Sequence, residues 1–111
     1  MSLVAQAERL CAHRLEHVAS TQYIAAFRTV GGYELALERN RKAIFCWAQP
    51  RRSASAPFTR KRVYLALDPR NSNLTSHCPN LSVGVPAHYW KFDGLDAFES
   101  FLKWYEAACK P

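Results

Sequence analysis

Glycine is scarce in this sequence and long apolar runs are missing, and each shortage excludes a class of protein. The four glycines form no phosphate-binding loop, because Gly31-Gly32 precedes no predicted helix and Gly84 and Gly94 stand alone. No stretch approaches the roughly 18 apolar residues of a membrane helix. The first residues also lack the basic and apolar regions of a signal peptide. We therefore expect a cytoplasmic protein that makes no contact with a membrane.

Cysteine occurs four times but never as a Cys-x-x-Cys pair. Cys11, Cys46, Cys78 and Cys109 are widely spaced, and three of them fall in apolar patterns. In a reducing compartment such residues are most simply thiols that pack as small hydrophobic side chains. The sequence thus predicts neither a disulfide framework nor a metal centre, and no cofactor is expected.

Length and composition indicate one globular domain. Of 111 residues, 49% are apolar and 22% charged, the balance of an ordinary soluble domain. This length supports one hydrophobic core and is too short for two, so we expect a single domain over residues 1–111. No internal repeat is present. The remaining feature is charge, since 15 Lys and Arg against 9 Asp and Glu give a net charge of +6.

The first half of the chain reads as a helix followed by a meander of strands. Apolar residues spaced by three and four predict a helix over 3–19. From residue 21 the period changes to two, which predicts strands over 21–28 and 33–38 joined by a turn at Gly31-Gly32. The nearly continuous apolar run over 42–49 is typical of a central strand.

The second half predicts two more strands and a helix. The strands cover 61–67 and 87–92, and between them 68–86 is either an ordered loop or contains a short strand. Asp93 is the expected N-cap of a helix that is apolar around most of its girth. The fold class is therefore α+β: an N-terminal helix, an antiparallel meander sheet of about five strands, and a C-terminal helix packed on the sheet.

Three segments carry a resemblance to a known group of proteins. They are Tyr33-Glu-Leu-Ala-Leu-Glu-Arg-Asn40, Tyr89-Trp-Lys-Phe-Asp93, and Phe98-x-x-Phe101-Leu102-x-Trp104-Tyr105. In size and layout the chain resembles the small orphan α+β proteins of bacterial integron mobile gene cassettes. The resemblance implies a soluble, often oligomeric bacterial accessory protein, and it assigns no functional residue.

The sharpest motif is His13-Arg-Leu-Glu-His17, which matches the H-x-x-E-H pattern of zinc peptidases. Both histidines fall outside the apolar stripe of the predicted helix, so a solvated helix flank is the simpler interpretation, and no metal site is expected. Arg14 falls inside that stripe. Its guanidinium must reach solvent along its stem, pair with a carboxylate, or face a ligand or a partner such as a second subunit.

His77-Cys78 lies in the long loop, where a neighbouring imidazole can lower the pKa of a thiol and create a nucleophile. Adjacent side chains seldom point at each other, and no third group is identifiable to orient the histidine. An ordinary loop is therefore the simpler interpretation, and no catalytic residue is assigned.

The positive charge is concentrated in one segment, since no acidic residue lies between Arg39 and Leu67. The strands over 42–49 and 61–67 are joined by a predicted loop over 50–59. If these strands are near neighbours, Arg60 to Arg62 return close to Arg51 and Arg52 at one end of the sheet. Phosphate groups of a nucleic acid are the natural ligand of such a cluster, whereas a basic loop that only confers solubility is the alternative. The anion-binding candidates are Arg51, Arg52, Arg60, Lys61 and Arg62.

Aromatic residues are abundant, with three Trp, five Tyr and six Phe. About half must be core, and the rest form an exposed apolar patch if the helices cover only one face of the sheet. Such patches mark subunit interfaces or ligand pockets, so we expect a homodimer or higher homo-oligomer. The candidate ligand or interface residues are Trp47, Tyr64, Tyr89, Trp90, Trp104 and Arg14.

No enzyme signature emerges from the carboxylates, because only Glu34 and Glu38 share a predicted strand face, roughly 13 Å apart. The first hypothesis is a non-enzymatic oligomeric protein that binds a small ligand or a protein partner through its aromatic face and the 68–86 loop. The alternative is a nucleic-acid-binding accessory factor that uses the basic 39–62 cluster, where Trp47 and Tyr64 on adjoining strands would stack on bases.

Overall fold

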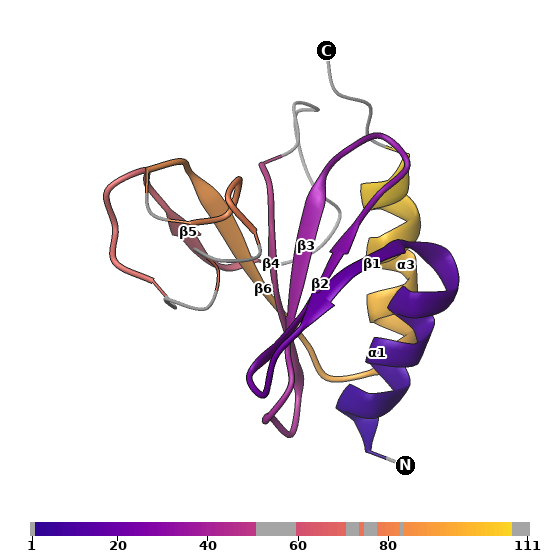
Figure 1. Ribbon diagram of the computed structural model, residues 1–111. Coiled ribbons are helices and arrows are strands. Elements are labelled where there is room, and N and C mark those ends of the chain that lie inside the picture. The colour runs from indigo at the N-terminus through magenta and orange to yellow at the C-terminus, as the bar shows by residue number, and fades with distance from the viewer. Residues whose placement is uncertain (1, 51–59, 71–73, 75–77, 83, 108–111) are drawn as a thin grey trace.

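The computed structural model describes residues 2–50, 60–70, 74, 78–82 and 84–107, and for residues 60–62 it describes the backbone. This part of the chain forms an α+β fold in which two helices cover one face of a six-stranded sheet (Figure 1). No helix within these residues is both long and apolar enough to cross a membrane. The elements are α1 (Leu3–Arg14), β1 (Glu16–Ser20), β2 (Ile24–Arg28), β3 (Glu34–Glu38), β4 (Ile44–Ala48), β5 (Arg60–Tyr64), β6 (Ala87–Phe92) and α3 (Leu95–Glu106).

The strand order is β1-β2-β3-β4-β6-β5, and every neighbouring pair is antiparallel. The first four strands form a meander, and β6 then inserts between β4 and β5. Since β4 and β5 both run antiparallel to β6, they run parallel to each other. The two strands are therefore near neighbours, but β6 separates them, so the expectation that Trp47 and Tyr64 lie on adjoining strands is wrong.

The first helix is shorter than predicted. It begins after Ser2, whose hydroxyl accepts a hydrogen bond of 3.1 Å from the Ala5 N–H, and it ends at Arg14. Leu15 adopts an extended conformation, and the residues that follow form edge strand β1 against β2. The helical spacing of Leu15 and Val18 thus continues past the end of the helix, because strand pairing overrides it.

The meander matches its sequence pattern. Strands β2, β3 and β4 lie within the ranges predicted for them, and β6 has the predicted bounds. Between β2 and β3 the turn is closed by Gly32, whose φ of 91° lies in the left-handed region that favours glycine. Its N–H donates to the Thr29 carbonyl over 2.9 Å.

The two faces of the sheet bury separate apolar clusters. Helices α1 and α3 lie side by side on the first face, and the residues buried there include Phe27, Leu35, Trp90, Phe98 and Phe101 (Figure 1). On the second face, Leu74, Cys78 and Leu81 pack against the sheet. We call this second group the second-face cluster; its members from the sheet are Ile24, Ala26, Ala36, Trp47, Ala87 and Tyr89.

Helix α3 is tied to the sheet by Tyr105. Its hydroxyl donates to the Glu34 carbonyl over 2.5 Å and accepts from the Gln49 N–H over 2.8 Å. The N-cap of the helix is Gly94, which provides no side-chain hydrogen bond, so the prediction that Asp93 caps the helix is wrong. The helix is therefore held in place by the packing of its apolar residues and by Tyr105, and no side-chain cap contributes.

Candidate functional site

The aromatic residues of the second face are buried or partly buried. Trp47 is 3% exposed and Tyr89 5%, and their ring centroids lie 4.5 Å apart. Tyr64 contacts Trp47 across the intervening strand, with 4.6 Å between the ring centroids. The expected exposed patch does not form here, because the segment that follows β5 covers this face with Leu74, Cys78 and Leu81. The same burial leaves no room for a base to stack on Trp47.

Trp90 and Trp104 belong to the opposite face. Trp90 is 1% exposed and lies 6.0 Å from the Trp104 ring, which packs partly buried against the helix-covered core. Tyr89 and Trp90 are consecutive strand residues, so they point to opposite sides of the sheet. The five aromatic residues among the predicted interface residues are thus divided between the two clusters, and Arg14 belongs to neither of them.

Glu38 is the centre of a polar cluster within the second face. Its carboxylate accepts hydrogen bonds from the Tyr89 hydroxyl (2.7 Å), the Trp47 ring N–H (3.1 Å) and the Arg41 Nε (2.9 Å). Burial, and then the neighbouring Glu38, raise the pKa of Tyr89 above its usual value, so the phenol stays protonated. With three donors on one carboxylate, this cluster is a structural hydrogen-bond network.

Glu34 shares the face of Glu38, as the alternation predicts, and is also buried. Its two carboxylate oxygens accept from the backbone N–H and the side-chain amide of Asn80, over 2.9 and 3.1 Å. This pair of bonds fastens the covering segment to β3. The carboxylate therefore serves to close the second face.

Arg14, which the sequence places in the apolar stripe of the first helix, is paired with a carboxylate. It forms a two-pronged ion pair with Glu106 of α3, in which Nη2 donates to Oε2 over 2.7 Å and Nε to Oε1 over 3.1 Å. Both side chains are about a quarter exposed, at 28% and 23%. Of the alternatives open for Arg14, the structure has the ion pair, and it links the two helices.

The fold places the two histidines of the His13-Arg-Leu-Glu-His17 motif in different elements. His13 lies in the last turn of α1, whereas His17 lies on β1, where its Nε2 is 2.7 Å from the Ser20 hydroxyl oxygen. Among the residues that the structure describes, no three His, Cys, Asp or Glu side chains could hold a metal ion together. Burial raises the pKa of the Cys78 thiol to about 12, and Glu34 adds to this effect, so the thiol is not an activated nucleophile. His77 lies outside the described residues.

The structure describes only part of the basic segment. Arg51 and Arg52 lie outside the described residues, and of Arg60, Lys61 and Arg62 only the backbone is described. β5 runs parallel to β4, and through β6 the backbone of Arg60 lies level with Cys46 and that of Arg62 with Trp47. That residues 60–62 lie close to Arg51 and Arg52 stays a prediction.

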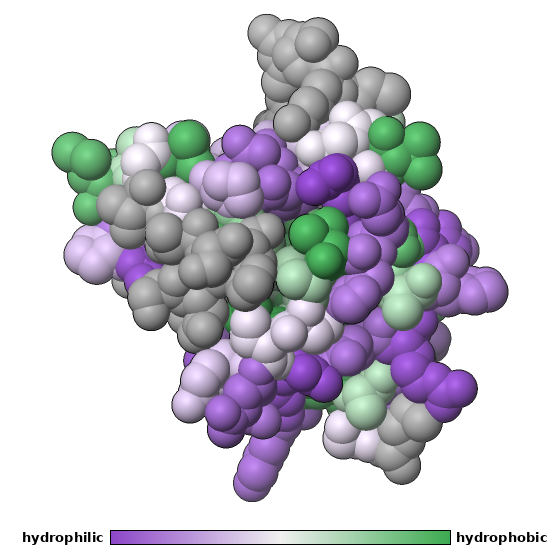
Figure 2. All heavy atoms as spheres, in the orientation of Figure 1, coloured by the Kyte–Doolittle hydropathy of each residue, from purple (hydrophilic) through white to green (hydrophobic). Residues whose placement is uncertain are grey.

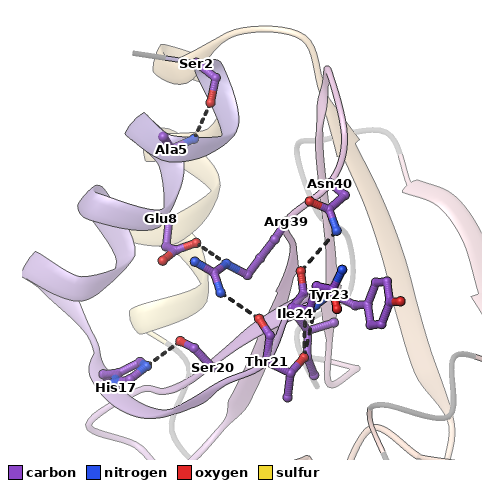
Figure 3. Close-up of polar contacts among 11 residues, drawn as sticks. Ser2, Ala5, Glu8, His17, Ser20, Thr21, Tyr23, Ile24, Arg39 and Asn40 are labelled. Atoms are coloured by element: carbon purple, nitrogen blue, oxygen red, sulfur yellow. Dashed lines mark hydrogen bonds and ion pairs between the residues drawn. The ribbon is translucent and has the colours of Figure 1, made fainter.

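Arg39 belongs to the basic segment in sequence, but its guanidinium forms contacts elsewhere. Its guanidinium donates to the Glu8 carboxylate over 3.0 Å and to the Thr21 carbonyl over 2.6 Å (Figure 3). Figure 3 also shows that the side chain points toward α1, away from the ring of Tyr23. Arg39 thus joins α1 to the sheet and adds no charge to the second face.

A lobe beside β5 is organised around one arginine, which sequence reasoning missed. Arg70 donates to the carbonyls of Leu65 (2.6 Å), Asp68 (3.3 Å), Leu81 (2.8 Å) and Val85 (2.8 Å). We call residues 65–70, 81, 82 and 84–86 the Arg70 lobe. Two further bonds brace it, from the Gly84 N–H to the Ala66 carbonyl and from the Leu65 N–H to the Asp68 carboxylate.

The Arg70 lobe presents two leucines to solvent. Leu65 is 66% exposed and Leu67 84%, and next to them Val63 on β5 is 40% exposed. Figure 2 shows hydrophobic atoms at the outer end of the lobe that extends from β5. The two leucines are exposed together on a segment that many internal hydrogen bonds hold in place, and exposed apolar residues that form a patch mark interaction sites. It is the strongest candidate for an interaction surface on the described chain.

Neither a protein-family model, nor a curated protein, nor a solved structure matches this chain.

Proposed function

We propose that this chain is a non-catalytic interaction protein that associates with a second copy of itself through Leu65 and Leu67. The observation that carries the proposal is the exposure of these leucines on the hydrogen-bonded Arg70 lobe. Burying one leucine side chain contributes roughly 1.5–3 kcal/mol to association. A two-fold contact would bury both leucines of each copy.

The edges of the sheet are less suited to self-association than the Arg70 lobe. The edge strands are β1 and β5, and the register of each is interrupted, between His17 and Ala19 and between Arg60 and Arg62. β5 also carries three consecutive basic residues. Irregular pairing and edge charge are the features by which proteins prevent strand-to-strand pairing between copies. The leucines supply an alternative contact that needs no sheet edge.

Sedimentation velocity over a concentration series tests this proposal. We expect the wild-type chain to shift from monomer to dimer as its concentration rises to tens of micromolar, about −6 to −7 kcal/mol of association free energy. The Leu67→Asp variant should remain monomeric over the same range, because a carboxylate in the contact would have to be desolvated.

Val30→Asp is the matched control. Val30 is also an exposed apolar residue, at 103%, but it lies in the turn between β2 and β3. This variant should dimerise like the wild type. A wild-type chain that stays monomeric, or a Val30→Asp variant that loses the dimer as fully as Leu67→Asp does, would refute the role of the leucines.

A further inference from the structure

A hollow of about 310 Å³ opens between α1 and the edge strand β1. We call it the α1–β1 hollow. Three elements, α1, β1 and β2, supply its lining, which includes Glu8, Arg9, Ala12, His17, Ser20 and Phe27. Its volume lies at the lower end of the roughly 300–1,000 Å³ of pockets that hold small molecules. The hollow therefore has room for a ligand of one ring and a short chain.

A β-bulge in β1 brings two polar side chains of this lining together. His17 is the partner of Phe27 on β2, and Ala19, two residues further on, is the partner of the very next β2 residue, Ala26. Regular alternation would place His17 and Ser20 on opposite faces of the sheet, and the extra residue of the bulge places both on one face. There the His17 Nε2 lies 2.7 Å from the Ser20 hydroxyl oxygen, and Figure 3 shows the two side chains pointing toward one another.

The His17–Ser20 pair suits a ligand atom that accepts hydrogen bonds. If the Ser20 hydroxyl donates to Nε2, the imidazole keeps its Nδ1–H, and if Nε2–H donates to the hydroxyl oxygen, the hydroxyl keeps its own hydrogen. In either tautomer the pair thus has one donor beyond the bond between its members. A carboxylate oxygen accepts from such a donor and cannot compete as a donor itself.

The charges around the α1–β1 hollow also favour an anion. The Glu8 carboxylate accepts from the Arg39 Nε over 3.0 Å, so a cation compensates it. Glu16 and Arg28, at the other end of β1, lie 3.8 Å apart and offset each other. Arg9 is exposed on the lining and stays protonated at every physiological pH. Three arginines against two glutamates leave a net charge of +1 around the hollow.

An aromatic wall completes the lining. The His17 imidazole rests on the Phe27 ring, with 5.5 Å between the ring centres, and Phe27 is itself 1% exposed. Beside them, Ala12 contributes a small apolar side chain from α1. Because aromatic rings pack well in offset or edge-to-face contact, this wall favours a ring over an aliphatic chain.

We propose that the α1–β1 hollow binds a small aromatic monocarboxylate, with its ring beside Ala12 and the imidazole and its carboxylate on the His17–Ser20 pair and Arg9. An apolar lining with a few converging polar groups is the usual composition of a small-molecule site. The hollow lies at the β1 edge of the sheet, whereas the Arg70 lobe follows β5 at the opposite edge. Binding therefore does not depend on self-association.

Heteronuclear NMR titration of the full chain with 3-phenylpropionate tests the proposal. We expect a Kd on the order of 1 mM, as is usual for a ligand of this size. The amide signals that shift most should belong to β1 and to the second half of α1. 3-Phenylpropanol keeps the ring without the charge, and propionate keeps the carboxylate without the ring. Each should bind roughly fivefold more weakly or worse, because each lacks one of the two contacts.

Two identical substitutions form a matched pair. Ala12→Phe places a ring inside the hollow and should weaken binding of 3-phenylpropionate by about tenfold or more. Ala97 is likewise an exposed alanine on a helix, but it lies on α3, so Ala97→Phe should keep the Kd within about twofold of the wild type. If Ala12→Phe does not fold, Arg9→Gln provides a second test. It should weaken binding of 3-phenylpropionate about threefold and leave that of 3-phenylpropanol unchanged, whereas Lys103→Gln should change neither.

The outcome for this site is separate from the outcome for the dimer. Leu67→Asp should bind 3-phenylpropionate like the wild type, so loss of self-association leaves the site intact. The proposal is overturned if 3-phenylpropionate causes no shifts up to about 10 mM, or if 3-phenylpropanol or propionate binds equally well. An equal loss of binding in Ala12→Phe and Ala97→Phe would overturn it too, as would an equal loss in Arg9→Gln and Lys103→Gln.

Discussion

At the scale of single residues, charged side chains hold this fold together through backbone and buried partners. Arg70 gathers four carbonyls and Glu38 gathers three donors, and neither pattern is visible in the sequence. Every residue type has a backbone carbonyl, so the sequence could not predict which carbonyls Arg70 contacts. Arg14 could be predicted in part, because a guanidinium within an apolar stripe requires a compensating group, which Glu106 supplies.

Replacing Arg70 tests the weight of its contacts. Arg70→Gln removes most of the hydrogen bonds that join the two halves of the Arg70 lobe, and Gln is too short to reach all four carbonyls. We expect a loss of about 2–3 kcal/mol in the free energy of unfolding, measured by urea denaturation. Lys103→Gln on the surface of α3 should change it by less than about 0.5 kcal/mol. Equal stability of Arg70→Gln and the wild type would show that water replaces the guanidinium.

At the scale of elements, the sequence predicted those that local pattern decides. Alternation identified β2 and β3, and a continuous apolar run identified β4. The prediction from local pattern was wrong at β1. Leu15 and Val18 have a helical spacing, but long-range pairing with β2 makes this segment a strand. The position of β6 between β4 and β5 is likewise a matter of pairing across distant parts of the chain.

The exposed leucines show how a boundary error hides a candidate site. Leu65 and Leu67 fall within the strand predicted over 61–67, where alternation would place both side chains on the same face of the sheet. The strand ends at Tyr64, because the Asp68 carboxylate accepts from the Leu65 N–H and turns the chain. Both leucines thereby leave the sheet and become exposed.

Tyr105 links helix α3 to two strands, and its removal tests that link. Tyr105→Phe preserves the ring but leaves the Glu34 carbonyl and the Gln49 N–H without their hydroxyl partner. We expect a loss of about 1–3 kcal/mol in the free energy of unfolding, since these groups are partly or fully buried. Tyr23→Phe, at a ring that is half exposed, should leave the stability nearly unchanged. A Tyr105→Phe variant as stable as Tyr23→Phe would mean that packing alone seats the helix.

At the scale of the whole molecule, the core contains groups that ionise only at high pH. Burial raises the pKa of the Cys78 thiol to about 12, and it raises those of Cys11, Cys46 and Tyr105 well above their ordinary values. In the unfolded chain these thiols ionise near pH 9. Above that pH the unfolded chain has released protons that the folded chain keeps, so alkali favours unfolding.

We therefore expect the free energy of unfolding to change little through these groups below pH 9 and to fall as pH rises toward 12. Each proton contributes a slope of roughly 1.4 kcal/mol per pH unit, so three buried thiols together contribute roughly 4 kcal/mol per pH unit. Urea denaturation in reductant between pH 7 and about 10.5 measures the slope. In Cys78→Ala the thiol contribution should be about a third smaller. A stability that does not fall in alkali would show that the thiols ionise in the folded chain.

The pairing of Arg14 with Glu106 has a consequence for how the chain acquires its fold during synthesis. These residues are 92 positions apart, and the helices they join share one face of the sheet. A ribosome produces α1 before the six strands and α3, so α1 is synthesised before the neighbour that covers its apolar side. Contacts of such long sequence separation form late. Until α3 emerges, the nascent chain exposes the kind of apolar surface that chaperones bind.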